Sequence, residues 1–231
     1  MFRHRLPVGP QPPPTIGHTP PVNLIDVLAL AVLFVVGARL VEAARASVEA
    51  RRKALTVVRG LHARHFLLGL PVIVVVIGAA ALLIQLPVLS FGWWTALGGE
   101  GNPVFGTTEQ SLGVLEVAVP VAFVSLLVVS LPLLVAREEW IFRRGAERRG
   151  TWNNIGRCIL FGLAHAIIGI PLGAALALSL GGAYLTACYL RGWRTTRSQA
   201  GALLESTRAH LAYNASILAL IGATLAITAS L

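Results

Sequence analysis

Charged residues are scarce in this sequence of 231 residues. Asp, Glu, Lys and Arg make up 13% of the chain, whereas 55% of it is hydrophobic. A soluble domain has roughly 25% charged residues, so this composition argues against one. Several apolar runs approach the ~20 residues that a helix needs to cross a bilayer. We therefore expect an all-α, polytopic integral membrane protein.

Acidic residues are rarer than basic ones. The chain has 10 Asp and Glu against 19 Lys and Arg, which gives a formal net charge of +9. Such a charge is typical of proteins that bind nucleic acid or an anionic membrane surface. The arginines gather in the loops between apolar runs, and no stacking aromatic residues alternate with them. The lipid bilayer is therefore the expected partner, and nucleic acid is not.

Cysteine is almost absent. Cys158 and Cys188 both fall in apolar surroundings, without the C-x-x-C spacing of a metal or redox pair. We expect two buried thiols that fill space.

The N-terminal residues 1–22 lack the apolar run of a cleavable signal. They contain seven of the 13 prolines and follow Arg3 and Arg5 with a proline-rich stretch. We expect a disordered tail there, and a single transmembrane helical domain over 23–231 with no internal repeat.

Apolar segments alternate with basic loops along that domain. The predicted spans are about six in number, at 23–40, 66–90, 114–136, 155–168, 172–190 and 208–231. Because the loops after the first, third and fifth spans are basic, we place them in the cytoplasm and both termini outside, in a bacterial or archaeal cell membrane.

Two further features of this map are the first cytoplasmic loop and a tryptophan pair. A charged amphipathic helix is predicted over 42–65, where it either lies on the membrane surface or extends the spans into the cytoplasm. Trp93 and Trp94 end the second span and are expected to anchor it at the outer interface.

Glu138 and Glu139 lie where the third apolar run meets a basic segment. Glu139 precedes Arg143 by four residues, which is the spacing of an ion pair on a helix. That pair would leave Glu138 free to face the other spans.

The two histidines outside the tail and the first basic loop are expected at a similar depth. His165 lies ten residues into the fourth span and His210 at the entry of the sixth, and both spans start from the cytoplasmic side. Asn214 follows His210 by one helical turn and projects from nearly the same face. Polar side chains in apolar helices usually face a bundle interior or a hydrated cavity, so these residues and Glu138 are expected to share one pocket.

Hydrolysis is the chemistry that such a pocket supports. A carboxylate in a poorly solvated site can take a proton from water, and a histidine can orient that water. A second histidine and an amide can donate hydrogen bonds to an oxyanion. Alternatively, zinc with an open coordination position could be held by Glu138, His165 and His210. The residues leave both routes open.

Three short motifs resemble those of the CAAX protease and bacteriocin-processing (CPBP, or Abi) family of intramembrane proteases, in the same order. They are Glu138-Glu139-x-x-x-Arg143, Phe161-x-x-x-His165 and His210-x-x-x-Asn214, and they fall within residues 114–231. That family includes the endopeptidases that remove the last three residues of prenylated CAAX proteins.

The resemblance implies a role for each motif residue. Glu138 would activate water with help from His165, and His210 and Asn214 would bind the oxyanion. The supporting residues would be Glu139, Arg143 and Phe161. It implies an intramembrane endopeptidase that acts on membrane-associated peptides or proteins, with no cofactor as the first choice and zinc as the alternative.

One position departs from the family pattern. Many relatives carry an Asn four residues after the histidine of the second motif, where this chain has Gly169. The alternative is therefore a non-catalytic membrane immunity or scaffold protein that retains the protease architecture.

Overall fold

The computed structural model of the chain describes residues 24–45, 47–96 and 114–228. These residues are mostly helical and contain no strand, which confirms the all-α class. The predicted N-terminal tail and most of the loop after the second span lie outside the described residues.

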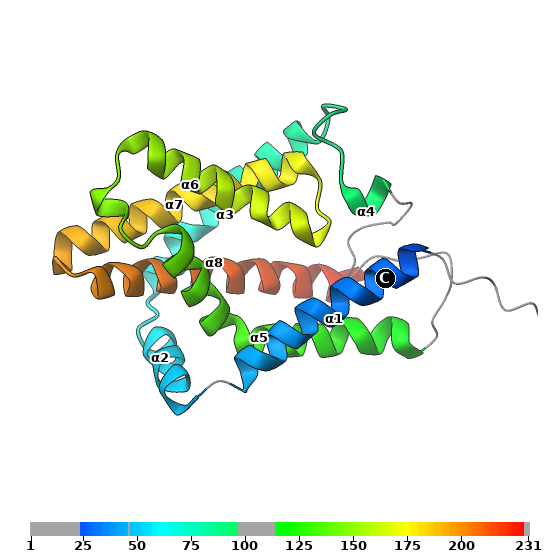
Figure 1. The fold of residues 1–231 in the computed structure, drawn as a ribbon, viewed down its shortest axis with the longest axis horizontal. Coiled ribbons are helices and arrows are strands. Elements are labelled where there is room, and N and C mark those ends of the chain that lie inside the picture. Colours follow the sequence, from blue (N-terminus) through cyan, green and yellow to red (C-terminus); the bar gives the residue numbers. More distant parts are fainter. Residues whose placement is uncertain (1–23, 46, 97–113, 229–231) are drawn as a thin grey trace, which may run out of the picture.

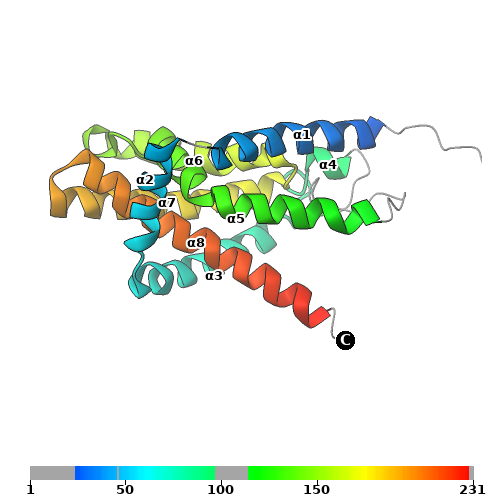
Figure 2. The ribbon, with the colours of Figure 1, turned by 90° about the horizontal axis from the view of Figure 1, so that it is seen from below.

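The described chain is a bundle in which the long helices run broadly along the longest axis of the molecule and one shorter helix, α2, lies across them (Figures 1 and 2). The α-helices are α1 (Leu24–Ala44), α2 (Val48–Arg59), α3 (Ala63–Leu83), α4 (Trp93–Ala96), α5 (Val114–Phe142), α6 (Thr151–Ala164), α7 (Leu172–Thr196) and α8 (Gln199–Thr228). Two 3-10 segments, η1 (Ala146–Arg148) and η2 (His165–Ile168), connect α5 to α6 and α6 to α7.

Three described segments are long and apolar enough to cross a membrane. They are Ala63–Leu83, Val121–Arg148 and Leu172–Thr196, and they correspond to the second, third and fifth predicted spans. Their apolar side chains are largely exposed on the outside of the bundle, as Val74 and Ile77 of α3 are. Such a surface suits lipid and not water.

The single helix predicted over 42–65 is wrong. The chain leaves α1 after Ala44, and Ser47 starts α2 by accepting a hydrogen bond from the backbone N–H of Ala50 at 3.3 Å. α2 ends at Arg59 and is followed by Gly60, where the guanidinium of Arg208 occupies the space that a Cβ would need. The predicted stretch thus contains the end of α1, all of α2 and the start of α3.

The break predicted at residues 169–171 is confirmed. Gly169 has a φ of +89°, a left-handed conformation that ends η2 and that glycine adopts without strain. Pro171 then caps the start of α7. The last helix differs from the prediction, since α8 begins at Gln199 and not at 208.

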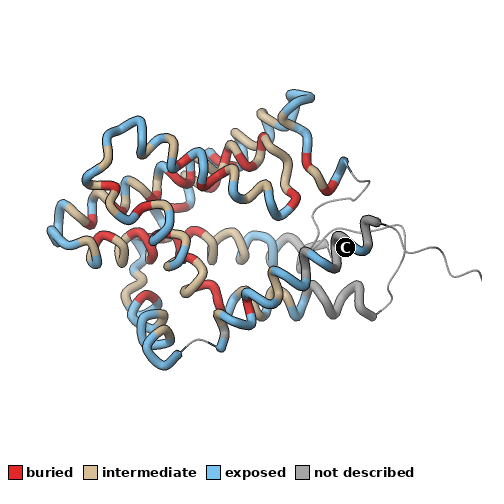
Figure 3. Tube along the Cα trace, in the orientation of Figure 1, coloured by how far each residue is buried: buried red, intermediate tan, exposed pale blue. Residues whose placement is uncertain are grey.

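Small residues on α7 let the neighbouring helices approach closely. A Cβ on Gly182 of α7 would lie 3.1 Å from the carbonyl oxygen of Cys158 on α6, and one on Gly162 of α6 would overlap the carbonyl oxygen of Ala175 on α7. Buried residues are accordingly concentrated where α6, α7, α8 and the C-terminal part of α5 meet (Figure 3). Close helix contacts through small residues are the usual way in which membrane helices associate.

The tryptophan pair is held by the protein. The indole N–H of Trp93 donates to the carbonyls of Ala166 and Ile167 at 3.1 and 3.2 Å, and Trp94 is buried with 1% exposure. Both rings thus contact the protein, and their predicted position at the outer interface stays a prediction. The carbonyl of Ala166 also accepts from the backbone N–H of Gly169 at 3.0 Å, so the indole adds a second donor at the end of η2.

Candidate functional site

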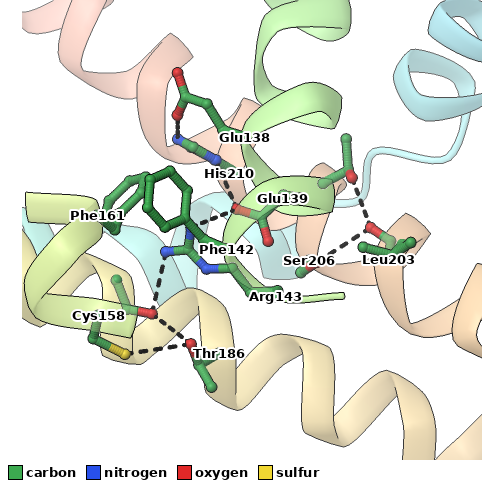
Figure 4. Close-up of polar contacts among 12 residues, drawn as sticks. Glu138, Glu139, Phe142, Arg143, Cys158, Phe161, Thr186, Leu203, Ser206 and His210 are labelled. Atoms are coloured by element: carbon green, nitrogen blue, oxygen red, sulfur yellow. Dashed lines mark hydrogen bonds and ion pairs between the residues drawn. The ribbon is translucent and has the colours of Figure 1, made fainter. Parts of the chain in front are cut away.

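A polar cluster joins four helices near the basic end of the bundle. Figure 4 shows Glu138 and Glu139 of α5, and Arg143 directly after α5, beside Phe161 of α6 and His210 of α8. The backbone N–H of Arg143 still donates to the carbonyl of Glu139 at 2.9 Å, so the two side chains lie one helical turn apart on the same face.

Glu139 is at the centre of this cluster. Its side chain is fully buried, and its Oε1 lies 2.9 Å from Nδ1 of His210 and 3.5 Å from Nη1 of Arg143. The predicted ion pair with Arg143 is confirmed. The contact with His210 was not predicted, because the sequence suggested only a structural role for Glu139. A carboxylate can only accept a hydrogen bond, so Nδ1 of His210 carries the proton in this contact.

Glu138 meets the other ring nitrogen of the same histidine. Its Oε2 lies 3.6 Å from Nε2 of His210, and its side chain is 36% exposed. His210 thus lies between two adjacent carboxylates, a buried one and an accessible one (Figure 4). The convergence predicted for Glu138 and His210 is confirmed.

Arg143 is a buried cation with three kinds of partner. It is 1% exposed, pairs with Glu139, donates from Nη2 to the carbonyl of Gly182 at 3.3 Å, and lies over the ring of Phe161 with 4.0 Å between its Cζ and the ring centroid. An aromatic face and a carbonyl both carry negative potential, so they add to the charge of the carboxylate.

Phe161 connects the two histidines. Its ring makes edge-to-face contacts with His165 and His210, at centroid distances of 4.9 and 5.6 Å, and with Phe142 at 5.4 Å. The phenyl group offers no proton, and the structure shows what it does instead: it packs against three groups of the cluster and fixes their relative positions.

His165 lies next to Phe161, at the point where α6 becomes η2. Its Nδ1 is 2.8 Å from the carbonyl oxygen of Phe161, so Nδ1 donates and Nε2 remains available as an acceptor when the ring is neutral. In the described part of the chain, His165 forms no ion pair with Glu138. The ring of Phe161 therefore separates His165 from His210, and His165 is not a direct partner of Glu138.

Asn214 lies one turn after His210 on α8 and is half-buried. Within the described residues, no hydrogen bond of its side chain links it to the cluster. Of the four residues predicted to share a pocket, the structure brings Glu138 and His210 into contact, links His165 to them through Phe161, and leaves Asn214 unattached.

Some residues of the polar cluster could not be identified from the sequence. Gly182 supplies the carbonyl that Arg143 binds, and the Thr186 hydroxyl donates to the same carbonyl at 2.9 Å. Cys158 lies 3.5 Å from that hydroxyl, measured from sulfur to oxygen. The only hint was the pair of adjacent glycines inside an apolar run, which indicates close helix packing.

Three buried polar atoms of the cluster have no hydrogen-bond partner among the described residues: Oε2 of Glu138, Oε2 of Glu139 and Nη1 of Arg143. Two of them, Oε2 of Glu138 and Nη1 of Arg143, lie in the ion-pair contacts given above, at 3.6 and 3.5 Å.

The described residues contain no group of three or more His, Cys, Asp or Glu side chains that could hold a metal ion. Glu138 and His210 are close, but His165 does not join them, and Nδ1 of His210 is bonded to Glu139. The ligand set predicted for zinc is therefore not assembled in this arrangement.

Comparison with known proteins gives no relative: no protein-family model, no curated protein and no solved structure matches the chain. The likeness to the CAAX protease and bacteriocin-processing family thus depends on the three short motifs alone.

Proposed function

We propose that the chain is an intramembrane endopeptidase that hydrolyses peptide bonds of membrane-associated substrates, with Glu138 as the base that activates water. The observation that carries this proposal is the position of His210 between two carboxylates, 2.9 Å from Glu139 and 3.6 Å from Glu138. A histidine oriented by a buried carboxylate, next to a group that can reach water, is a recurring arrangement in hydrolytic sites. The order of the three motifs supports the same function.

The surroundings of the two glutamates favour different roles for them. Glu139 is fully buried and engaged by both His210 and Arg143, so it acts on the ring of His210 and not on substrate. Glu138 is 36% exposed and can reach both water and a bound peptide. A general base must lie within hydrogen-bond reach of the proton that it takes, and only Glu138 meets that condition from the open side.

The proposed reaction proceeds in two steps. Glu138 takes a proton from water while the water oxygen bonds to the carbonyl carbon of the scissile peptide, and the carbonyl π electrons move to its oxygen. In its doubly protonated form, His210 keeps Nδ1–H on Glu139 and donates from Nε2–H to this oxyanion; Asn214 donates as well, and Nε2 of His165 orients the water. When the carbonyl re-forms, the C–N bond breaks, and Glu138 returns the proton to the departing amine. The proposed route assigns no step to a metal, and zinc held by Glu138, His165 and His210 is the alternative.

The proposed setting is a bundle of about six spans in a bacterial or archaeal cell membrane. The candidate spans α3, α5 and α7 support this map, and the 30 residues of α8 are long enough to serve as a further span. The cluster lies beside the basic segment after α5, which contains Arg144 and Arg148. Basic loops favour the cytoplasmic side, so the pocket would face the cytoplasm.

A second candidate is a non-catalytic membrane scaffold or immunity protein. The buried contacts of Glu139 favour it, because Arg143 and His210 link α5 to α7 and α8 whether or not any reaction occurs. In that case the cluster would act as a structural clamp, and Glu138 would have no special role.

The test compares membranes of cells that carry the wild type, Glu138→Gln or Glu42→Gln. Glu42 is the matched control, since its side chain is 70% exposed and pairs with Arg39 on the surface. Mass spectrometry of membrane peptides should detect fragments in wild-type and Glu42→Gln membranes that are missing from Glu138→Gln membranes. All three proteins should insert and melt alike. The same fragments in all three strains would refute the peptidase proposal and favour the scaffold.

A further inference from the structure

The helix that lies across the bundle, α2, is attached to it by one face only. Val57 is 5% exposed and packs with Leu131 and Val135 of α5 and with Leu211 of α8. Arg208 of α8 also donates to the carbonyl of Thr56 at 3.2 Å. These contacts fix which side of α2 faces the bundle.

The opposite side of α2 combines apolar and basic residues. Helical geometry places six side chains within an arc of about 120° on the side away from Val57. All six are exposed: Val48, Leu55, Val58, Arg51, Arg52 and Arg59. We call these six residues the outer face of α2. The apolar members are 69%, 50% and 44% exposed in the order given, and α2 is mostly exposed along its length (Figure 3).

The three arginines of the outer face are uncompensated. In the described parts of the chain, none of their side chains forms an ion pair or a hydrogen bond with the protein. Glu49, which is the acidic residue of α2, pairs with Lys53 at 3.0 Å. The outer face therefore carries three positive charges and no negative one.

The position of α2 relates it to the bilayer surface. Gly60 ends α2, and the candidate span α3 begins at Ala63. The axis of α2 runs across the long helices in both views (Figures 1 and 2). A helix that is crosswise to the spans and adjacent to the end of one of them lies along the plane of the membrane surface.

We propose that the outer face of α2 binds anionic phospholipid headgroups at the membrane surface. The guanidinium groups of Arg51, Arg52 and Arg59 pair with lipid phosphates, for which their planar fork is suited. Val48, Leu55 and Val58 enter the boundary between headgroups and acyl chains, and the arginine stems extend from that depth towards the phosphates.

The mixture of residues favours lipid over an acidic protein segment. An acidic peptide would neutralise the arginines but would leave the three apolar side chains in water. A bilayer surface satisfies both kinds of side chain at once, and it is adjacent to α2 through α3.

The test measures the affinity of the purified full-length protein for phosphatidylglycerol in zwitterionic micelles, by titration calorimetry. The variant combines Arg51→Gln, Arg52→Gln and Arg59→Gln. A control removes the same charge from other exposed positions, with Arg157→Gln, Arg191→Gln and Arg194→Gln. We expect the Kd of the α2 variant to rise at least fivefold, roughly the contribution of one basic residue near an anionic surface. We expect the control to change the Kd by less than about twofold, on the same scale.

Two further arms distinguish the source of the phosphate and the role of the apolar residues. Glycerophosphate, which has the headgroup chemistry without acyl chains, should bind far more weakly than the lipid. Leu55→Asn keeps all three arginines and should weaken binding of the lipid but not of glycerophosphate. Equal Kd values for the α2 variant and its control would overturn the proposal, as would glycerophosphate binding as tight as that of the lipid. Melting temperatures of all variants show that the comparison concerns folded protein, and no arm depends on peptidase activity.

Discussion

Replacing Glu139 by Gln removes one negative charge from a fully buried site and keeps the shape of the side chain. In the wild type, the carboxylate lies 2.9 Å from Nδ1 of His210 and 3.5 Å from Nη1 of Arg143. Those partners are themselves only 2% and 1% exposed. In the variant, Arg143 keeps the carbonyl of Gly182 and the ring of Phe161, but it has no counter-charge in its contact shell.

The unpaired charge of Arg143 lowers the free energy of unfolding of this variant. Breaking a buried ion pair by neutralising one partner costs about 3–5 kcal/mol. For a chain of 150–250 residues, each kcal/mol lowers the melting temperature by about 2–4 °C, so the expected fall is about 6–20 °C. Thermal unfolding of the purified protein in detergent, followed by circular dichroism, measures this fall.

The matched control is Glu42→Gln, which removes the same charge from an exposed ion pair. The carboxylate of Glu42 is 2.9 Å from Nη1 of Arg39, and its side chain is 70% exposed. Exposed pairs contribute at most about 1 kcal/mol, so the melting temperature should change by less than about 4 °C.

A double variant separates the unpaired charge from other causes. If the cost of Glu139→Gln comes from leaving Arg143 unpaired, then combining it with Arg143→Met should destabilise the protein by less than the sum of the two single changes. A melting temperature of Glu139→Gln equal to that of Glu42→Gln would refute the reasoning. Strict additivity in the double variant would refute it as well.

Two other predictions concern helix packing and the metal question. Gly162→Ala should lower stability by about 1–3 kcal/mol, because its Cβ would overlap the Ala175 carbonyl of α7. Gly156 lies on the same helix, and a Cβ added there would have no atom within 4 Å. Gly156→Ala should therefore leave stability unchanged or raise it by about 1 kcal/mol. The melting temperatures of the two variants test this difference. Wild-type protein treated with excess chelator should keep its peptide-releasing activity, whereas a loss that added zinc restores would support the zinc route.

Features that depend on local spacing could be predicted from the sequence. The pairing of Glu139 with Arg143 needs only the i, i+4 geometry of one helix, and the structure confirms it. The break between α6 and α7 needs only the conformations that Gly169 and Pro171 favour. The all-α class followed from long apolar runs, since hydropathy reports the environment of a whole segment.

The position of His210 along its helix could not be predicted in this way. The sequence placed the start of the last helix at 208, after the basic residues Arg191, Arg194 and Arg197. The structure starts α8 at Gln199, since Glu205 pairs with Arg64 at 3.1 Å and Arg208 with the carbonyl of Thr56 at 3.2 Å. Polar residues that find partners on α2 and α3 can belong to a packed helix. His210 thereby lies well inside α8 and not at its entry.

The roles of Phe161 and Gly182 depend on tertiary contacts. Nothing in the local sequence indicates that one phenyl ring touches two histidines and an arginine, or that a glycine carbonyl receives a guanidinium N–H. Both contacts arise because α6 and α7 approach closely at their small residues. Such an approach is a property of two helices together, and a pattern along one of them cannot report it.

The contact of both glutamates with one histidine also defines what each can do. The ion-pair spacing of Glu139 and Arg143 suggested that only Glu138 would face the histidine. The ring of His210 instead lies between the two side chains, with one nitrogen towards each carboxylate. For Glu139 to exchange a proton with water, it would have to leave Arg143, which is 1% exposed and would then be an unpaired buried charge. Glu138 can exchange protons without that cost, because its side chain is 36% exposed.

Neutralising Glu139 should therefore reduce stability first, whereas neutralising Glu138 should reduce activity and leave the melting temperature almost unchanged. The opposite result would exchange the two roles.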